Sequence, residues 1–297
     1  MISRSWSIKL SLLLIIAVIL GLIAQASVNR IPTRADSPEI TGIDLPVVVS
    51  AKHSNPKMDS ALSQLIDAAS QGKALPFAQQ SGINLESNKV RVILESKPDK
   101  LQEAILAIQA NGGDFEISYN NLIQARFPIS ALNDIASSPY VNFVNKPNAP
   151  IASETTIESM ELINASAWNT AGYNGTGISI GVLDVGFKNY STLLGTDLPS
   201  SIADTWWSPT IGYNEFEHGT ACAEVIHDIA PNASLYFATC YTLVEWGNAI
   251  DWLISKEVDI ISCSLTWLNG GPGDCTGTIC DAVSAAADDG ILWVNSA

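Results

Sequence analysis

His218 has the surroundings expected of a general base in this chain of 297 residues. It lies in the segment EHGTACAEVIHDIAPNASL (217–235), where apolar residues recur every four positions, as on one face of a helix. Ala230-Pro231 ends that helix, because proline cannot continue it. His218 is therefore predicted in the first turn of a buried helix at the edge of a cleft, where a general base is useful. By itself, such a histidine is more often a polar surface residue or a satisfied core residue.

A carboxylate that could orient this histidine occurs in ISIGVLDVGF (178–187). The apolar, partly β-branched run 178–183 is typical of a strand buried on both faces of a parallel sheet. Asp184 follows at its C-terminal tip, the place where open α/β sheets form their ligand crevice. The plainer alternative is an aspartate that ends a strand in a turn. We expect the Asp184 carboxylate to lie within hydrogen-bonding reach of the His218 imidazole.

Together these segments resemble the Asp-x-Gly and His-Gly-Thr motifs of the subtilisin-like serine proteases, in which aspartate, histidine and serine follow in that chain order. VDIISCSLTW (258–267) is similar to the family's strand that leads into its substrate-binding segment, and GILWVNSA (290–297) to the strand before its oxyanion-hole asparagine. The resemblance implies catalytic roles for Asp184 and His218. It also implies that Ser264, Leu265 and Thr266 bind extended protein or peptide substrates as an added strand.

The resemblance is incomplete at the nucleophile. The family's serine lies in a Gly-Thr-Ser turn far downstream, and that tripeptide does not occur in this sequence. We therefore expect the chain to be truncated before the serine and inactive as given, while the full-length product is a serine endopeptidase. Trp267 stands where the family usually has small residues, and Val185 and Glu217 are further departures.

The segments around these motifs alternate between strand and helix. Helical spacing over 243–257 and 278–289 alternates with apolar strand patterns over 258–265 and 291–295. This alternation predicts an α/β fold with a doubly wound, mainly parallel sheet. The resemblance of the motifs implies that residues 151–297 are the N-terminal part of a subtilisin-like peptidase domain, and the alternation agrees with that fold.

Residues 1–26 have the pattern of a secretory signal peptide. A positive start is followed by an apolar run over 10–23 and by Ala24-Gln25-Ala26, a cleavage site. The alternative is an uncleaved membrane anchor, but the run is short for a span. We expect a secreted, extracellular protein without a membrane segment after cleavage.

Residues 27–150 combine a loose leader, a helical pattern over 57–72, and a regular β-α-β-β-α-β order from Val90 onward. Ser130 is expected to cap its second helix. This order is that of a small α+β, ferredoxin-like domain. Its position ahead of the protease motifs resembles the subtilase propeptide, which implies a folding chaperone and temporary inhibitor in a self-processed precursor. Residues 146–156 have two prolines and no periodicity, as in a linker suited to self-cleavage.

The acidic charge lies almost entirely in the second half. Residues 1–150 contain 13 Lys+Arg and 12 Asp+Glu (+1), and residues 151–297 contain 2 and 18 (−16), which together give −15. Such acidity disfavours nucleic acid as a partner. The expected mechanism requires no cofactor and no metal; bound calcium is compatible with the charge, as is acidity that only keeps a secreted protein soluble.

All five cysteines also lie in the second half. Cys222, Cys240 and Cys263 are interpreted as small core residues, whereas Cys275 and Cys280 flank four residues and could pair as a disulfide or stay free.

Two other function classes remain open. One is a secreted binding module that kept the fold without catalysis. The other is a protease inhibitor or chaperone in which residues 57–150 are the active part.

Overall fold

The structure is a computed structural model that describes residues 55–152, 163–268 and 270–296. The predicted signal peptide and most of the leader lie outside the described residues. Residues 50–297 form one unit by their internal contacts. In the part of the chain that the structure describes, no helix combines the length and apolarity needed to cross a lipid bilayer.

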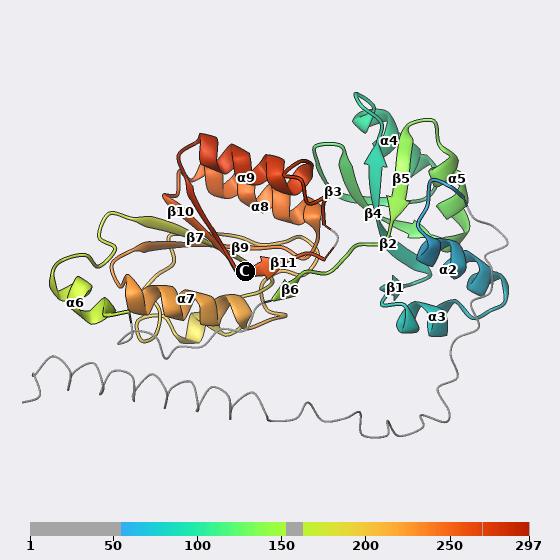
Figure 1. Cartoon of the computed structure of the whole chain (residues 1–297). Helices are drawn as coiled ribbons and strands as arrows, with labels where there is room; N and C mark the ends of the chain where they lie inside the picture. Colours follow the sequence, from blue (N-terminus) through green and yellow to red (C-terminus); the bar gives the residue numbers. More distant parts are fainter. Residues whose placement is uncertain (1–54, 153–162, 269, 297) are drawn as a thin grey trace, which may run out of the picture. The chain divides into compact units, whose positions relative to one another are not determined.

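The first part of this unit is an antiparallel sheet with helices, in the predicted β-α-β-β-α-β order (Figure 1). The elements of that order are β2 (Lys89–Ser96), α4 (Leu101–Ala110), β3 (Asp114–Tyr119), β4 (Leu122–Pro128), α5 (Leu132–Ser137) and β5 (Val141–Asn145). Strand β2 lies centrally and pairs with β4 and β5, and β3 pairs with β4. Helix α2 (Ser60–Ser70) matches the helical pattern over 57–72.

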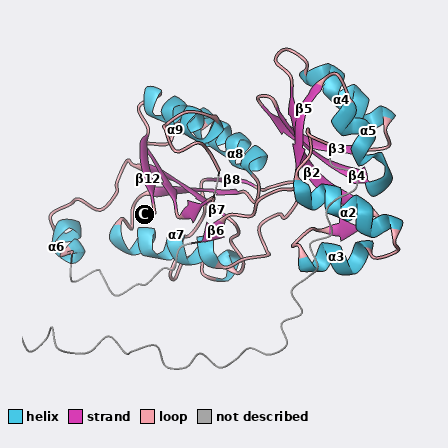
Figure 2. Ribbon diagram, turned by 45° about the vertical axis from the view of Figure 1, so that its right-hand side comes forward, coloured by secondary structure: helices cyan, strands magenta, loops and turns pink. Residues whose placement is uncertain are grey.

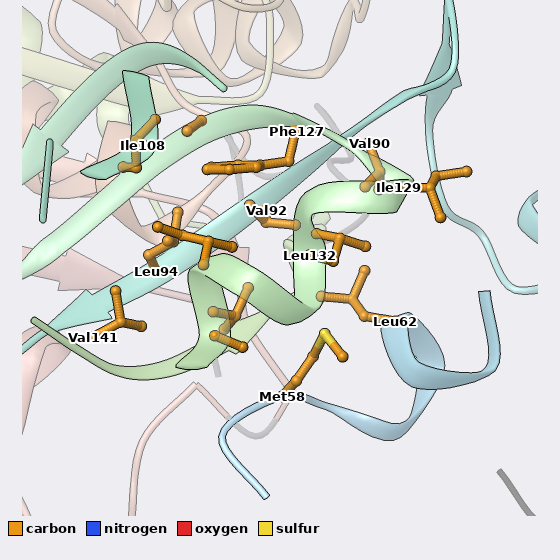
Figure 3. Close-up of a cluster of buried hydrophobic side chains, with 14 of the residues drawn as sticks. Met58, Leu62, Val90, Val92, Leu94, Ile108, Phe127, Ile129, Leu132 and Val141 are labelled. Atoms are coloured by element: carbon orange, nitrogen blue, oxygen red, sulfur yellow. The ribbon is translucent and has the colours of Figure 1, made fainter. Parts of the chain in front are cut away.

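A hydrophobic core on one face of this sheet explains why these strands form. Side chains of β2 and β4 alternate, so that Val90, Val92, Leu94 and Phe127 are fully buried on the core face (Figure 3). Helices α2, α4 and α5 add apolar side chains to the same core. The opposite face carries polar residues such as Glu116 and Gln124, and also the apolar Ile93, Ile117 and Tyr119, which pack into the core of the second part of the unit.

Three local predictions differ from the structure. Ser130 does not cap a helix: it lies inside the 3₁₀ turn η1 (Ile129–Ala131), and α5 begins after that turn without a side-chain cap. Helix α3 (Ala74–Gln80) and the two-residue strand β1 (Leu85–Glu86) were not predicted, because neither is long enough to show a clear hydrophobic period.

The second part is built on a parallel sheet of five strands in the order β12-β10-β7-β9-β8. These strands are β7 (Ser179–Asp184), β8 (Asp204–Trp206), β9 (Ser234–Thr239), β10 (Ile260–Cys263) and β12 (Leu292–Asn295). Helix α7 (His218–Ile229) covers one face, and α8 (Leu243–Ser255) and α9 (Thr278–Asp288) cover the other (Figures 1 and 2). The expected α/β fold with a largely parallel sheet is confirmed.

Strand β7 is buried on both faces, as its apolar run predicted. Ile180 and Val182 pack with residues of α7, while Leu183 belongs to the core under α8 and α9. Gly181 faces Leu253 of α8, and a Cβ there would lie 2.6 Å from its Cδ2 atom, so the glycine permits close helix–sheet packing. The sequence did not predict β8, which is only three residues long.

One linker segment also departs from expectation. Helix α6 (Ala165–Thr170) follows it in the chain. The linker 146–156 was expected to have no regular structure, yet it contains strand β6 (Ile151–Ala152), which pairs antiparallel with β11 (Leu265–Thr266). Such a short strand has no hydrophobic period, and its pairing partner lies more than 100 residues away along the chain.

Candidate active site

Asp184 and His218 meet at the carboxyl edge of the parallel sheet. Asp184 is the last residue of β7 and is fully buried, and His218 is the first residue of α7. Nδ1 of His218 lies 2.8 Å from Oδ2 and 2.9 Å from Oδ1 of Asp184. The contact that the two motifs led us to expect is therefore present, and the catalytic roles of both residues stay predictions.

Two glycines permit this approach. A Cβ on Gly219 would lie 2.6 Å from the carbonyl oxygen of Gly186 and 2.7 Å from the Cβ of Asp184. A Cβ on Gly186 would lie 2.7 Å from the carbonyl oxygen of Phe216. The backbone N–H of Gly219 donates to the Gly186 carbonyl at 2.9 Å, which ties the start of α7 to the segment after β7. The glycines of both motifs are thus explained by the close packing of two backbones.

The hydrogen bond determines which ring nitrogen of His218 holds the proton. Both carboxylate oxygens of Asp184 are acceptors, so Nδ1–H must be the donor, and Nε2 carries the lone pair when the ring is neutral. His218 lies at the positive end of the α7 dipole, which disfavours a charged imidazole. The Asp184 carboxylate, which contacts Nδ1, offsets that effect, so the lone pair of Nε2 on the other side of the ring can accept a proton.

Burial raises the pKa of the Asp184 carboxyl above its ordinary value, and hydrogen bonds oppose this shift. The largest opposing contribution comes from His218, and the backbone N–H of Val185 donates to Oδ1 at 2.7 Å. Cys222 contributes a further hydrogen bond to this carboxyl. The aspartate is thus held in one orientation by donors from a helix, from its own strand end and from a thiol.

The sequence reasoning missed the place of Cys222 in this site. Its Sγ lies 3.8 Å from Nδ1 and 4.0 Å from Nε2 of His218. The sequence contains a signal for this contact, because residues four apart are neighbours on a helix surface.

Cys240 and Cys263 do behave as core residues: burial raises the pKa of both thiols, that of Cys263 to about 12. Cys275 and Cys280 are free thiols in the structure, so of the two alternatives for this pair, disulfide or free, the structure has the free form.

The predicted substrate-binding residues lie at the end of β10. Leu265 and Thr266 form β11, and Ser264 lies between β10 and β11. Their partner strand is β6 of the same chain, with Thr266 opposite Ile151 and Leu265 opposite Ala152. Leu265 is buried and Thr266 is exposed, so β11 has one face against the core and an edge that accepts an extended segment. Substrate binding by these three residues stays a prediction.

A second set of contacts joins the antiparallel sheet to the start of α8. The fully buried Gln124 of β4 accepts a hydrogen bond from Thr242 Oγ1 at 2.6 Å and donates to Oε1 of Glu245 at 3.2 Å. Thr242 is also the N-cap of α8. In addition, a Cβ on Gly247 would lie 2.3 Å from the ring of Tyr119, so the glycine makes room for this tyrosine of β3.

No protein-family model matches the chain. Among proteins of known function, it is similar to subtilisin E of Bacillus subtilis (strain 168), with 24% identity over 225 residues that cover 70% of this chain and 54% of the relative. Subtilisin J of Geobacillus stearothermophilus matches with the same identity and coverage. The chain is subtilisin-like.

The subtilisin-like chain spans about half the length of the curated relatives it matches, 54% of each. Among solved structures, it is similar to the epidermin leader peptide processing serine protease of Staphylococcus aureus, with a TM-score of 0.45, 13% identity, and coverage of 71% of this chain and 60% of that one. The prediction that no cofactor or metal is required, with calcium compatible, stays a prediction.

Proposed function

We propose that the full-length protein is a secreted serine endopeptidase that hydrolyses peptide bonds with an Asp-His-Ser triad, in which Asp184 and His218 are two members. The observation that carries the proposal is the hydrogen bond between His218 Nδ1 and Asp184 Oδ2, 2.8 Å long, at the edge of a parallel sheet. The similarity to subtilisins supports the same reaction class.

In this mechanism, His218 Nε2 takes the proton of the nucleophilic hydroxyl as the hydroxyl attacks a peptide carbonyl, and later gives it to the leaving amine. Asp184 holds the ring in the tautomer with the proton on Nδ1 and stabilises the imidazolium that forms. Because Asp184 is buried and the site is partly shielded from water, this stabilisation is larger than it would be in solvent.

The pairing of β6 with β11 supports self-processing of a precursor. An extended substrate would bind β11 as an added strand, and in the structure residues Ile151 and Ala152 occupy that edge. We propose that these residues precede the processed peptide bond, which would then lie within the few residues after Ala152. The serine attacks its own chain there before it acts on other proteins or peptides.

The contacts on α8 support a propeptide role for the antiparallel sheet of residues 57–150. Gln124 reaches Thr242 and Glu245, and Tyr119 packs onto Gly247. These contacts do not depend on the covalent link at 146–156, so the domain can stay bound after that link is cut. While bound, it would cover the substrate edge through β6, which is temporary inhibition.

A fluorophosphonate probe on the full-length product tests the endopeptidase. We expect labelling of one serine that is lost in Asp184→Ala and His218→Ala. A folded full-length protein that is not labelled would overturn the proposal and favour the secreted binding module.

Detection of the mature protein in the culture medium of cells that express the full-length gene tests secretion. Retention of an unprocessed chain in the cells would contradict secretion.

N-terminal sequencing of the mature protein tests the processing site. We expect a new N-terminus within residues 153–157, and none in the His218→Ala variant. A mature N-terminus ahead of Ile151 would show that β6 does not mark the processed bond.

Inhibition by the released propeptide would be seen as a lag in activity. The lag should shorten when a second protease is added to degrade the propeptide.

A further inference from the structure

The Asp184–His218 pair has a third potential ligand beside it. Oδ of Asp184, a ring nitrogen of His218 and Sγ of Cys222 all lie within 4.8 Å of one another. The carboxylate is fully buried, the thiol is 6% exposed, and the imidazole is half-buried, so the group is reached through the histidine. Carboxylate, imidazole and thiolate are the three ligand types that zinc combines in proteins.

We propose that Asp184, His218 and Cys222 form a binding site for a thiophilic divalent cation such as Zn²⁺ or Cd²⁺, and that the bound cation switches off the proposed hydrolase. The second statement rests on the proposed function; the first does not. Three protein ligands leave a fourth tetrahedral position for water or another donor.

The geometry of the three residues is close to that of a coordination sphere. Nδ1 of His218 lies 2.8 Å from Asp184 Oδ2 and 3.8 Å from Cys222 Sγ. With metal–ligand bonds of about 2.0–2.3 Å, ligand atoms around a tetrahedral zinc lie roughly 3.2–3.8 Å apart. These spacings are of the size that a tetrahedral site needs, and because the Asp184 oxygen now lies where a cation on Nδ1 would bind, the ring and the carboxylate must turn apart to admit the cation.

The choice of thiol follows from distance, because the sulfur of Cys222 lies within 4.8 Å of ligand atoms of both Asp184 and His218. Cys222 shares a helix face with His218, one turn further along α7, so the two ligands come from one rigid element. Spacing of i and i+4 on a helix is a common way to offer two metal ligands on one side.

Inhibition follows from the proton balance. Before binding, the neutral imidazole has its proton on Nδ1, the thiol has its own, and the carboxylate has none. When the cation binds Nδ1 and the thiolate, the thiol proton is released to solvent and the ring proton is held at Nε2 instead. No oxidation or reduction occurs. Nε2–H is then a donor without a lone pair, so it cannot accept the proton of the attacking hydroxyl.

The binding test uses the purified chain in a Cys275→Ser/Cys280→Ser background, which removes the two thiols outside the core. Calorimetric titration with Zn²⁺ and the thiolate-to-metal absorption of a Cd²⁺ titration measure the site. We expect one thiolate-bearing site per chain, and a dissociation constant raised by at least about tenfold in Cys222→Ser and in His218→Ala. This background keeps Cys240 and Cys263 as internal controls.

Three outcomes would overturn the site: no Cd²⁺–thiolate absorption in the background chain, absorption that persists in Cys222→Ser, or affinities unchanged by both substitutions. Circular dichroism checks that each variant folds, and Cys222→Ala replaces Cys222→Ser if the serine variant does not. Weak binding that all variants share would come from surface carboxylates and would count against the proposal.

The inhibition test uses the full-length product and compares fluorophosphonate labelling with and without Zn²⁺ within each variant. We expect Zn²⁺ to reduce labelling in the background protein, and chelation to restore it. Labelling that Zn²⁺ does not change, while calorimetry shows the site filled, would overturn the inhibition but keep the site. Absence of labelling without any metal is a failure of the proposed function, and the titrations above still decide the site.

Discussion

Gly219 packs against Asp184 so closely that a methyl group on it would lie 2.7 Å from the Cβ of the aspartate. Because Gly219 directly follows His218, this contact determines how far the imidazole lies from the carboxylate. The Asp184–His218 hydrogen bond thus depends on the absence of a side chain at position 219 as much as on the two residues that form it.

Gly219→Ala is therefore expected to lower the free energy of unfolding by about 1–3 kcal/mol, the usual cost of overpacking. The added methyl group must displace backbone atoms of Gly186, which cannot move as freely as a side-chain end. Urea denaturation measures the change. Gly271→Ala is the matched control, since a Cβ there meets only Thr276 O at 3.9 Å; equal stability losses in both variants would contradict the packing argument.

Asp184→Asn should impair catalysis in the full-length product without unfolding it. Asparagine keeps the shape of the side chain, but its amide group can favour the wrong imidazole tautomer, and the imidazolium loses its counter-charge. We expect kcat to fall by about 10⁴-fold, as for this change in serine-protease triads. Asp228→Asn, near the far end of α7, is the control and should leave kcat unchanged. A loss below tenfold in Asp184→Asn would remove the aspartate from the mechanism.

Gln124→Glu should weaken the contact between the antiparallel sheet and α8. The Gln124 Nε2 donates to Glu116 at 3.0 Å and to Glu245 at 3.2 Å, so the substitution puts a third carboxylate between two others, one of them fully buried. We expect a loss on the order of 3 kcal/mol in the free energy of unfolding. Faster limited proteolysis in the linker would locate the effect. Gln102→Glu, exposed in the first turn of α4, is the control and should cost nothing.

Glu116 should make stability depend on pH in the acid range. Burial raises the pKa of Glu116, but its ion pairs with Arg91 and Arg126 and the amide of Gln124 outweigh burial, so the pKa lies below its ordinary value of 4.5. A depressed folded-state pKa stabilises the fold fully above pH 4.5, and this contribution is lost as the pH falls below 4.5 through the folded-state pKa.

The measurement is the free energy of unfolding as a function of pH for the wild type and Glu116→Gln. The difference between the two curves should shrink steadily on acidification below pH 4.5, because only the wild type loses this ionised group. A difference that is constant with pH would mean that Glu116 gains nothing from its ion pairs in the folded chain.

Sequence patterns predict the parallel α/β sheet, the position of Asp184 at a strand tip and that of His218 at a helix start. The reason is local: apolar runs, helical spacing, and the proline and glycine stops act over short stretches of chain. The order of elements from Val90 to Asn145 followed from the same patterns. Boundaries were less certain where a 3₁₀ turn replaced a helix start, as at Ser130.

Only the folded chain shows the pairing of β6 with β11 and the contacts of Gln124 with α8. Each of these contacts joins residues that are far apart in the sequence, and local sequence patterns do not predict such contacts. Ile151 and Thr266 are 115 positions apart, so no periodicity can link them. The contact of Cys222 with His218 is different, because a spacing of four positions on a helix already predicts neighbouring side chains. Long-range pairing is fixed only when distant segments meet in the folded chain, so local sequence patterns do not predict it.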